Sequence, residues 1–329
     1  QNKEYEKILY PETAFDEEER KAQQQKITDT RNAQPLLGIV DYAIADFLHS
    51  LDIIPDMVSG HSYGELAALC FAGVFSPEQL PVLSRKRAES ILNAIEEDKG
   101  MMVAVSLPQD DLEELLKQEN EVWAVNFNSK KQVVLAGTTC GMKDFMQKMT
   151  EKGIPHKQIN VACAFHSPLL KKSKDLYAEV LNDVVFKKPK IEVWSNTTAE
   201  VYPLKTKLIK ERLCEQLVKP VLFSKQLENM YNNGARIFIE TGPGRVLTGL
   251  VQSTLEPDVL TIPTEGNPNG VTFLLEAIAR YMQTGRKVNL EKLFEGRKPS
   301  IINIYDPEEF KERSQIWHIK GHTALPSVC

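Results

Sequence analysis

The segment DMVSGHSYGELAALCFAGVF, residues 56–75, carries a short apolar stretch, a serine between two glycines and then apolar residues at helical spacing. Strand, sharp turn and helix in this order are typical of a nucleophile elbow, which exposes a serine hydroxyl. Ser62 is therefore a candidate nucleophile, which needs a base and donors for an oxyanion. The backbone N–H of Tyr63, at the start of the predicted helix, is the candidate donor. Glycines that only pack a tight crossing around an uninvolved serine are the alternative.

The composition excludes several classes of protein. The 329 residues include 40 Lys and Arg against 45 Asp and Glu, so no basic excess favours a nucleic-acid partner. Five cysteines without a C-x-x-C pair predict neither a disulfide framework nor a zinc site, and they fit a reducing cytosol. No apolar run approaches the ~18 residues that span a bilayer, and the polar start is unlike a signal peptide. We therefore expect a cytoplasmic protein without a membrane or nucleic-acid partner.

The pattern of helices and strands predicts an α/β fold with two subdomains. Strands separated by helices in residues 1–99 and 163–285 indicate a hydrolase-like core, with a parallel sheet covered on both faces. Residues 100–162 read strand, helix, strand, strand, helix, strand, which is the order of a ferredoxin-like subdomain. Residues 286–329 lose periodicity and are predicted to be a linker or tail. That tail, and a start without methionine, lead us to expect a segment of a longer chain.

Six histidines are candidates for the base. They are His49, His61, His156, His166, His318 and His322. His166, in ACAFHSPLL, lies where a predicted strand gives way to a helix, and strand ends gather active sites in α/β folds. A capping or core histidine is the alternative reading of this position. His61, next to the serine, is expected to point to the other side of the turn.

Five separated motifs resemble those of the malonyl-CoA:acyl carrier protein transacylase family. They are GHSYGE, an arginine at position 87, NSKKQVVLAG, CAFHS and ETGPGRVLTGL, in the family's order and spacing. The resemblance covers about residues 30–285. It extends to the acyltransferase domains of polyketide synthases and, more narrowly, of polyunsaturated fatty acid and enediyne-type synthases.

The resemblance implies a ping-pong reaction through a seryl ester. The serine takes malonyl from malonyl-CoA and passes it to the phosphopantetheine thiol of an acyl carrier protein. By position, Ser62 is the nucleophile and His166 the general base, oriented by a main-chain carbonyl that matches Asn233. No metal and no bound cofactor are implied, because coenzyme A enters only as the carrier of the substrate. The implied partners are the acyl carrier protein and neighbouring synthase domains such as a ketosynthase.

The resemblance also assigns substrate recognition to three residues. Arg87 would hold the free carboxylate of malonyl through two parallel hydrogen bonds, and a solvated member of the basic run 85–87 is the alternative. Phe165 stands where relatives that take malonyl usually carry phenylalanine, whose ring would crowd an α-methyl group; a ring that only fills the core is the alternative. Asn128 matches an asparagine that lines the family's pocket.

One family feature does not occur in this sequence. The family opens with a strand and a G-Q-G turn, whose glutamine N–H supplies the second oxyanion donor. Loss of one such donor typically costs about a hundredfold or more in rate. Two other functions therefore stay open. A serine acyl hydrolase, such as an editing thioesterase, would use Ser62 and His166 without Arg87, and an impaired acyltransferase-like domain would only dock a carrier protein or a neighbouring domain.

Overall fold

The computed structural model describes residues 2–266, 270–297, 305, 317–320 and 323–326. The chain divides into two compact units, Gln1–Val288 and Asn289–Cys329. His322 and Cys329 lie outside the described residues. No helix within the described ranges is long and apolar enough to cross a membrane.

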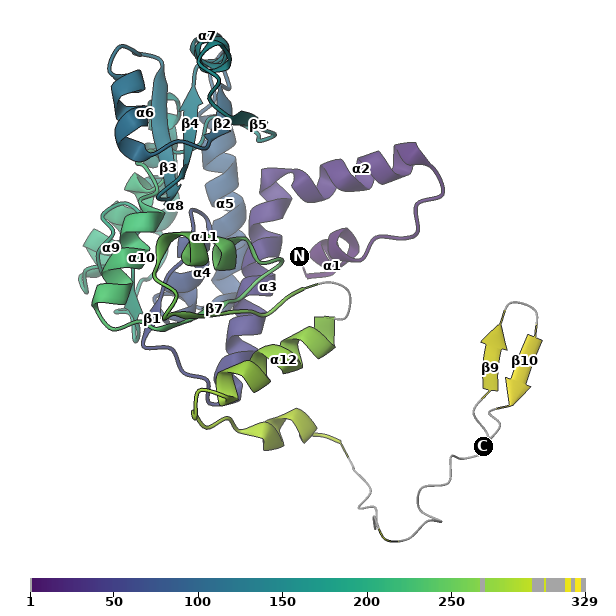
Figure 1. Ribbon diagram of the computed structural model, residues 1–329. Coiled ribbons are helices and arrows are strands. Elements are labelled where there is room, and N and C mark those ends of the chain that lie inside the picture. The colour runs from purple at the N-terminus through teal and green to yellow at the C-terminus, as the bar shows by residue number, and fades with distance from the viewer. Residues whose placement is uncertain (1, 267–269, 298–304, 306–316, 321–322, 327–329) are drawn as a thin grey trace. The chain divides into compact units, whose positions relative to one another are not determined.

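Helices open the first unit (Figure 1). They are α1 (Asn2–Leu9), α2 (Glu17–Thr28), α3 (Thr30–Ser50), α4 (Gly64–Phe71) and, after the 3-10 turn η1 (Pro77–Gln79), α5 (Leu80–Asn93). The side chain of Asp16 caps α2 by accepting a hydrogen bond from the N–H of Glu19 at 2.7 Å. The polar start forms two helices, and Tyr5 and Ile8 of α1 are buried against Leu36 of α3.

Two pairs of parallel strands lie within the large subdomain. β1 (Met57–Val58) pairs with β6 (Glu192–Val193), and β7 (Ile237–Glu240) pairs with β8 (Leu260–Pro263). The parallel pairing confirms the predicted fold class. In the described part of the chain the strands form separate pairs rather than one continuous sheet.

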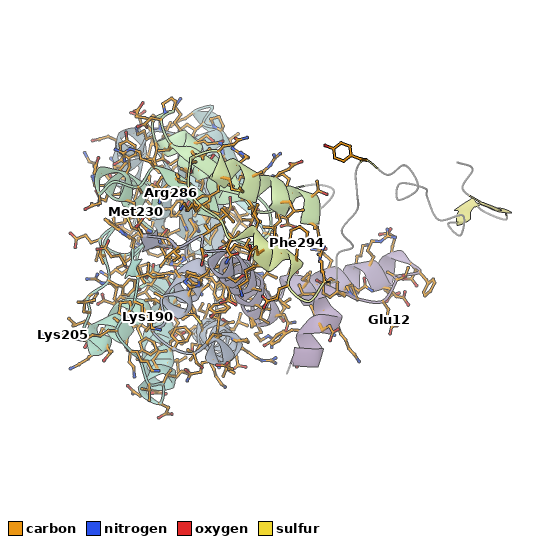
Figure 2. All side chains as sticks on the ribbon, turned by 90° about the horizontal axis from the view of Figure 1, so that it is seen from below. Glu12, Lys190, Lys205, Met230, Arg286 and Phe294 are labelled. Atoms are coloured by element: carbon orange, nitrogen blue, oxygen red, sulfur yellow. The ribbon has the colours of Figure 1, made fainter. Side chains whose placement is uncertain are left out.

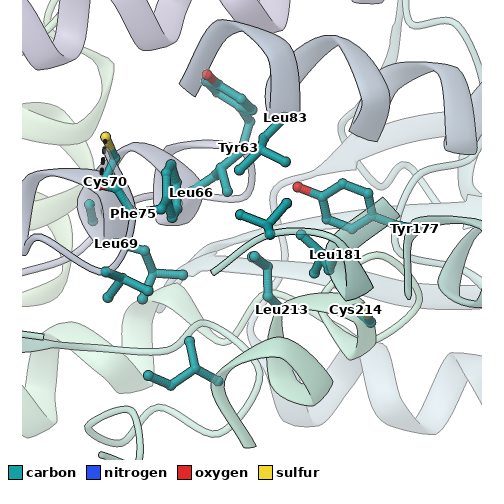
Figure 3. Packing of buried hydrophobic residues seen from close by; sticks show 14 of the residues in the cluster. Tyr63, Leu66, Leu69, Cys70, Phe75, Leu83, Tyr177, Leu181, Leu213 and Cys214 are labelled. Carbon is teal, nitrogen blue, oxygen red and sulfur yellow. Dashed lines mark hydrogen bonds between the residues drawn. The ribbon is translucent and has the colours of Figure 1, made fainter. Parts of the chain in front are cut away.

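Helices from both halves of the chain surround these strands. The later ones are α8 (Lys171–Asn182) after the 3-10 turn η2 (Pro168–Leu170), α9 (Thr206–Glu215), α10 (Phe223–Asn232), α11 (Val246–Thr254) and α12 (Gly270–Met282). The sequence interpretation did not single out β8 or α12. Leu66, Leu83, Tyr177, Leu181 and Leu213, from α4, α5, α8 and α9, belong to one buried cluster (Figure 3). Burial of each such side chain stabilises the fold by about 1.5–3 kcal/mol.

The inserted subdomain has the predicted ferredoxin-like topology. Its elements are β2 (Met101–Val105), α6 (Gln109–Leu116), β3 (Val122–Ser129), β4 (Gln132–Gly137), α7 (Thr139–Glu151) and β5 (His156–Ile159). The strands pair antiparallel in the order β3-β4-β2-β5 around their own apolar cluster. The N–H of Phe127 donates to the Val221 carbonyl at 2.9 Å, and the N–H of Val221 donates to the Val125 carbonyl at 2.8 Å. β3 therefore joins the small subdomain to the large one.

The second unit contains the 3-10 helix η3 (Leu290–Phe294) and an antiparallel hairpin of β9 (Trp317–Lys320) and β10 (Thr323–Pro326). The sequence predicted only a tail here. Four-residue strands are too short to show a clear alternation of polar and apolar residues, which explains why the pattern did not reveal them.

Charged side chains lie on the outside of the first unit, where Lys190 and Lys205 are exposed (Figure 2). Ion pairs such as Lys172–Glu96 join exposed side chains. Pairs of this kind contribute about 0–1 kcal/mol each, so the fold does not depend on them.

Candidate active site

Ser62 lies in the turn between β1 and α4 and has φ 51°, in the left-handed region. The turn is tight because Gly60 approaches the next turn of the chain. A Cβ built on Gly60 would lie 1.9 Å from the carbonyl carbon of Gly64, so only glycine fits there. The local sequence thus produces the strained, exposed-serine geometry of a nucleophile elbow.

The structure brings Ser62 and His166 together from positions 104 residues apart. The distance from Ser62 Oγ to His166 Nε2 is 2.6 Å, and Nδ1 lies 2.8 Å from the Gln216 carbonyl oxygen. A carbonyl oxygen only accepts, so Nδ1 carries the hydrogen and the lone pair of Nε2 faces the serine hydroxyl. Burial, and then the charge of Arg87, lower the pKa of His166 to about 3. The imidazole is therefore neutral at physiological pH, as a general base must be.

The prediction that the Asn233 carbonyl orients His166 is wrong. Asn233 is exposed at the end of α10, where its Nδ2 donates to the Asn229 carbonyl at 2.8 Å. The carbonyl that His166 uses belongs to Gln216, directly after α9. Carbonyls at the end of a helix have no partner inside it, which leaves this one free to accept from the histidine.

Two backbone N–H groups at the elbow differ in their use. The Ser62 N–H donates to Asn196 Oδ1 at 2.6 Å. The Tyr63 N–H, at the start of α4, takes part in no hydrogen bond among the residues that the structure describes. The Tyr63 side chain is buried beside Leu83 (Figure 3), and its hydroxyl lies 2.7 Å from Ser84 Oγ. This contact anchors the backbone of Tyr63. The Tyr63 N–H is thus available to an oxyanion that forms next to Ser62.

Arg87 is buried in α5, with 3% of its surface exposed, so it is not a solvated member of the basic run. Its Nη1 donates to Gln34 Oε1 at 2.9 Å and its Nη2 to Gln216 Oε1 at 2.8 Å. Its Nε has no partner, and none of the described carboxylates forms an ion pair with it. Burial lowers the pKa of Arg87. The neighbouring Arg85 instead pairs at the surface with Glu89.

Gln216 connects the three groups just described. Its side-chain Oε1 accepts from Arg87, its Nε2 donates to the Ser62 carbonyl at 2.6 Å, and its own carbonyl oxygen faces His166. The residue is 1% exposed. The sequence interpretation missed Gln216, Gln34 and Asn196, because an amide side chain outside a motif has no signature of its own.

The two remaining predicted residues lie at the border of the subdomains. Asn128 Oδ1 is 2.7 Å from Nε2 of His61, the residue before the serine. Phe165, directly before His166, is partly buried and packs against the apolar clusters of both subdomains. Its ring therefore contributes to the core and also flanks the histidine. No cluster of three or more potential metal ligands occurs among the described side chains.

The class of protein that this fold and this serine–histidine contact define is an α/β acyltransferase. The chain belongs to the acyl transferase domain family, whose model matches residues 12–288.

Three relatives illustrate the family. A polyunsaturated fatty acid synthase chain of Thraustochytrium sp. is 32% identical over 267 residues, which are 79% of this chain but 9% of that synthase chain. The malonyl CoA-acyl carrier protein transacylase of Bacillus subtilis (strain 168) is 34% identical over 234 residues, 69% of this chain and 74% of that enzyme. The acyltransferase domain of the second module of the salinomycin polyketide synthase superposes with a TM-score of 0.76 at 27% identity, covering 90% of this chain and 71% of that one.

A fourth comparison concerns a complex. A malonyl-transacylase solved with its type II polyketide synthase acyl-carrier protein has a TM-score of 0.72 and 27% identity, covering 78% of this chain and 83% of that one. The chain therefore spans most of the separate transacylases but about a tenth of the fatty acid synthase relative.

Proposed function

We propose that the chain moves malonyl from malonyl-CoA to the phosphopantetheine thiol of an acyl carrier protein through an ester on Ser62. The observation that carries this proposal is the state of Arg87. It is a buried cation, held by two neutral amide oxygens, with one N–H unpartnered and no ion pair to any carboxylate that the structure describes. A buried charge is costly unless it is paired. The terminal carboxylate of malonyl supplies that pair.

In the first half-reaction, His166 Nε2 accepts the proton of the Ser62 hydroxyl while Oγ attacks the thioester carbonyl. The Tyr63 N–H stabilises the oxyanion that forms. The tetrahedral intermediate then collapses, and coenzyme A leaves as a thiol after its sulfur takes the proton from His166. Ser62 is left as the malonyl ester.

In the second half-reaction, the phosphopantetheine thiol gives its proton to His166 and its sulfur attacks the ester carbonyl. The ester bond breaks, Ser62 Oγ takes the proton back, and malonyl leaves on the carrier protein. One histidine acts first as base and then as acid in each half, as microscopic reversibility requires.

Phe165 supports malonyl rather than a larger donor. Its ring is held by apolar contacts on two sides, so it has little freedom to make room for an α-methyl group beside His166. Unbranched malonyl fits this arrangement, and Asn128 would line the same pocket.

We also propose that the chain works beside other synthase domains, such as a ketosynthase. The names of the synthase relatives and the small share of their length that the chain spans support this. The cytoplasmic location stays a prediction from composition.

A hydrolase is less well supported. A hydrolase transfers an acyl group to water, and neither water nor a simple acyl group carries a carboxylate for Arg87 to bind. A hydrolase therefore does not explain why the buried Arg87 is linked through Gln216 to the backbone of Ser62. A domain that only docks its partners has no need for the 2.6 Å contact between Ser62 and His166.

The test is an assay of both products. The protein is mixed with malonyl-CoA, with and without a holo acyl carrier protein, and malonylated carrier and free malonate are measured by mass spectrometry. We expect rapid loading of the carrier, loss of loading in Ser62→Ala and normal loading in the matched control Ser59→Ala. Release of malonate at the same rate with or without the carrier would show that the protein is a hydrolase and not a transferase.

A further inference from the structure

We propose that Asn196 is a positioning residue for acyl transfer. It holds the turn at Ser62 and occupies the Ser62 N–H, so that the Tyr63 N–H is the backbone donor at the elbow that can bind the oxyanion. This inference rests on the proposed use of Ser62 as the nucleophile. It concerns the loop after β6, which no motif in the sequence indicates.

Asn196 is fully buried and every polar atom of its side chain is used. Oδ1 accepts from the Ser62 N–H at 2.6 Å, while Nδ2 donates to the Gly60 carbonyl at 2.7 Å and to Gln226 Oε1 at 2.7 Å. One carboxamide thus binds the backbone on both sides of His61. The Asn196 Nδ2 donor and Oδ1 acceptor take the places that a backbone N–H and carbonyl would take in a strand pair, so the side chain continues the pairing of β1 with β6.

The backbone pairing itself ends just before this point. The Trp194 N–H donates to the Val58 carbonyl at 2.9 Å, and the chain of β1 then turns away into the elbow. A non-glycine residue in a sparsely populated φ/ψ region costs on the order of 1–3 kcal/mol and persists only where its surroundings hold it. Ser62 has φ 51°. Asn196 contributes to holding it there, because Oδ1 accepts from the Ser62 N–H and Nδ2 donates to the Gly60 carbonyl, while Gln216 binds the Ser62 carbonyl.

Asn196 is in turn fixed by a buried carboxyl group. Its backbone N–H donates to Glu65 Oε2 at 2.8 Å, and the Tyr202 hydroxyl donates to Glu65 Oε1. Glu65 belongs to α4, the helix that begins directly after the elbow. The position of Asn196 is therefore tied to the helix that follows directly after the Tyr63 N–H.

This network divides the work between two consecutive amides. The Ser62 N–H is occupied by Asn196 Oδ1 and cannot reach an oxyanion, while the Tyr63 N–H has no partner within the described ranges of the chain. Substrate recognition is separate, because Arg87 is held by Gln34 and Gln216 and not by Asn196. Loss of Asn196 should therefore slow acylation of Ser62 without weakening the binding of malonyl-CoA.

The first experiment compares Asn196→Ala with the matched control Asn229→Ala, whose Nδ2 donates only to the Ala199 carbonyl. Single-turnover malonylation of Ser62 is followed over a range of malonyl-CoA concentrations. We expect the maximal rate of Asn196→Ala to fall about 10- to 100-fold, with half-saturation changed less than about threefold, because misplacement of a reacting group by ~1 Å costs about this much. The control should keep the wild-type rate. A wild-type rate in Asn196→Ala, or a loss confined to half-saturation, would overturn the proposal.

The second experiment uses Asn196→Asp and pH. A carboxylate still accepts from Ser62 but loses both donors, and protonation restores one of them. The ionisable groups around this position are Glu65, Tyr202, Arg87, Arg212, His166 and His61, which lies between Gly60 and Ser62. All of these groups are present in both wild type and variant, so the ratio of their rates reports the new carboxyl group. We expect the rate of Asn196→Asp relative to wild type to rise several-fold from pH 8 to pH 6. A constant ratio would contradict the proposed role.

A third arm separates this proposal from the proposed function. The same variants are treated with a fluorophosphonate, which labels activated serines and needs no malonyl recognition. If malonyl-CoA fails to react with wild type but the fluorophosphonate labels Ser62 faster in wild type than in Asn196→Ala, the positioning role stands and the substrate assignment falls. Equal labelling rates in correctly folded variants would refute the positioning role.

Discussion

Replacement of Arg87 with alanine should reverse the choice between malonyl-CoA and acetyl-CoA. Arg87 has five N–H donors, and two of them are bound by Gln34 and Gln216. The others, including the unpartnered Nε–H, remain for the substrate carboxylate. Acetyl has no carboxylate, so its transfer does not use this contact.

The magnitude follows from the number of bonds lost. A hydrogen bond to a charged group contributes about 1.5–3 kcal/mol, so a bidentate contact is worth about 3–6 kcal/mol. At 1.36 kcal/mol per decade, kcat/KM for malonyl-CoA should fall roughly 10²- to 10⁴-fold. The kcat/KM for acetyl-CoA should change less than about tenfold, because the substitution removes only ~1 kcal/mol of packing from its reaction.

The assay measures kcat/KM for both donors in wild type, Arg87→Ala and Arg85→Ala. Arg85 is on the same helix but pairs with Glu89 at the surface, so its replacement should leave both values within about twofold. Thermal unfolding of each variant checks that the fold is intact, since Arg87→Ala leaves two buried amide oxygens without donors. An equal fall for malonyl-CoA and acetyl-CoA in a folded Arg87→Ala would refute the assignment of Arg87 to the carboxylate.

Three further predictions follow from the same geometry. Because burial lowers the pKa of His166 to about 3, the base is neutral above that pH, and the rate of Ser62 malonylation should be flat from pH 5 to pH 8; a fall centred near pH 6.5 would contradict this. Gln216→Ala removes two side-chain bonds but keeps its carbonyl, so malonylation should slow about 10- to 100-fold through misplacement, whereas Asn233→Ala should be unchanged in the same assay. Burial raises the pKa of Asp41 from 3.8 to about 7, so the folded state binds more protons than the unfolded state between these values and stability falls as pH rises through them. In urea unfolding, Asp41→Asn should therefore raise the free energy of unfolding by up to about 4 kcal/mol more at pH 8 than at pH 4. An equal effect at both pH values would contradict this prediction.

The elbow and the ferredoxin-like subdomain were predictable because their signals are local. Ser62, the glycines around it and the apolar spacing of α4 lie within 20 residues, and the alternating helices and strands of 100–162 define the subdomain by order alone. His166 was predictable from its position between a strand and a helix.

The supporting amides were not predictable in this way. The Ser62 backbone binds Gln216 and Asn196, which are 154 and 134 residues away. Such contacts depend on how α9 and β6 pack, and no motif specifies them. β1 and β6 are two residues long each, because the side chain of Asn196 replaces backbone pairing where the chain enters the elbow.

Transfer through Ser62 can be observed directly by measuring the intact mass of the protein after brief mixing with malonyl-CoA and then digesting it to locate the adduct. We expect one malonyl group, on the peptide that contains Ser62, which disappears when a phosphopantetheine thiol is added and never forms in Ser62→Ala. Malonyl-CoA consumed without any adduct, or an adduct that persists in Ser62→Ala, would contradict transfer through this serine.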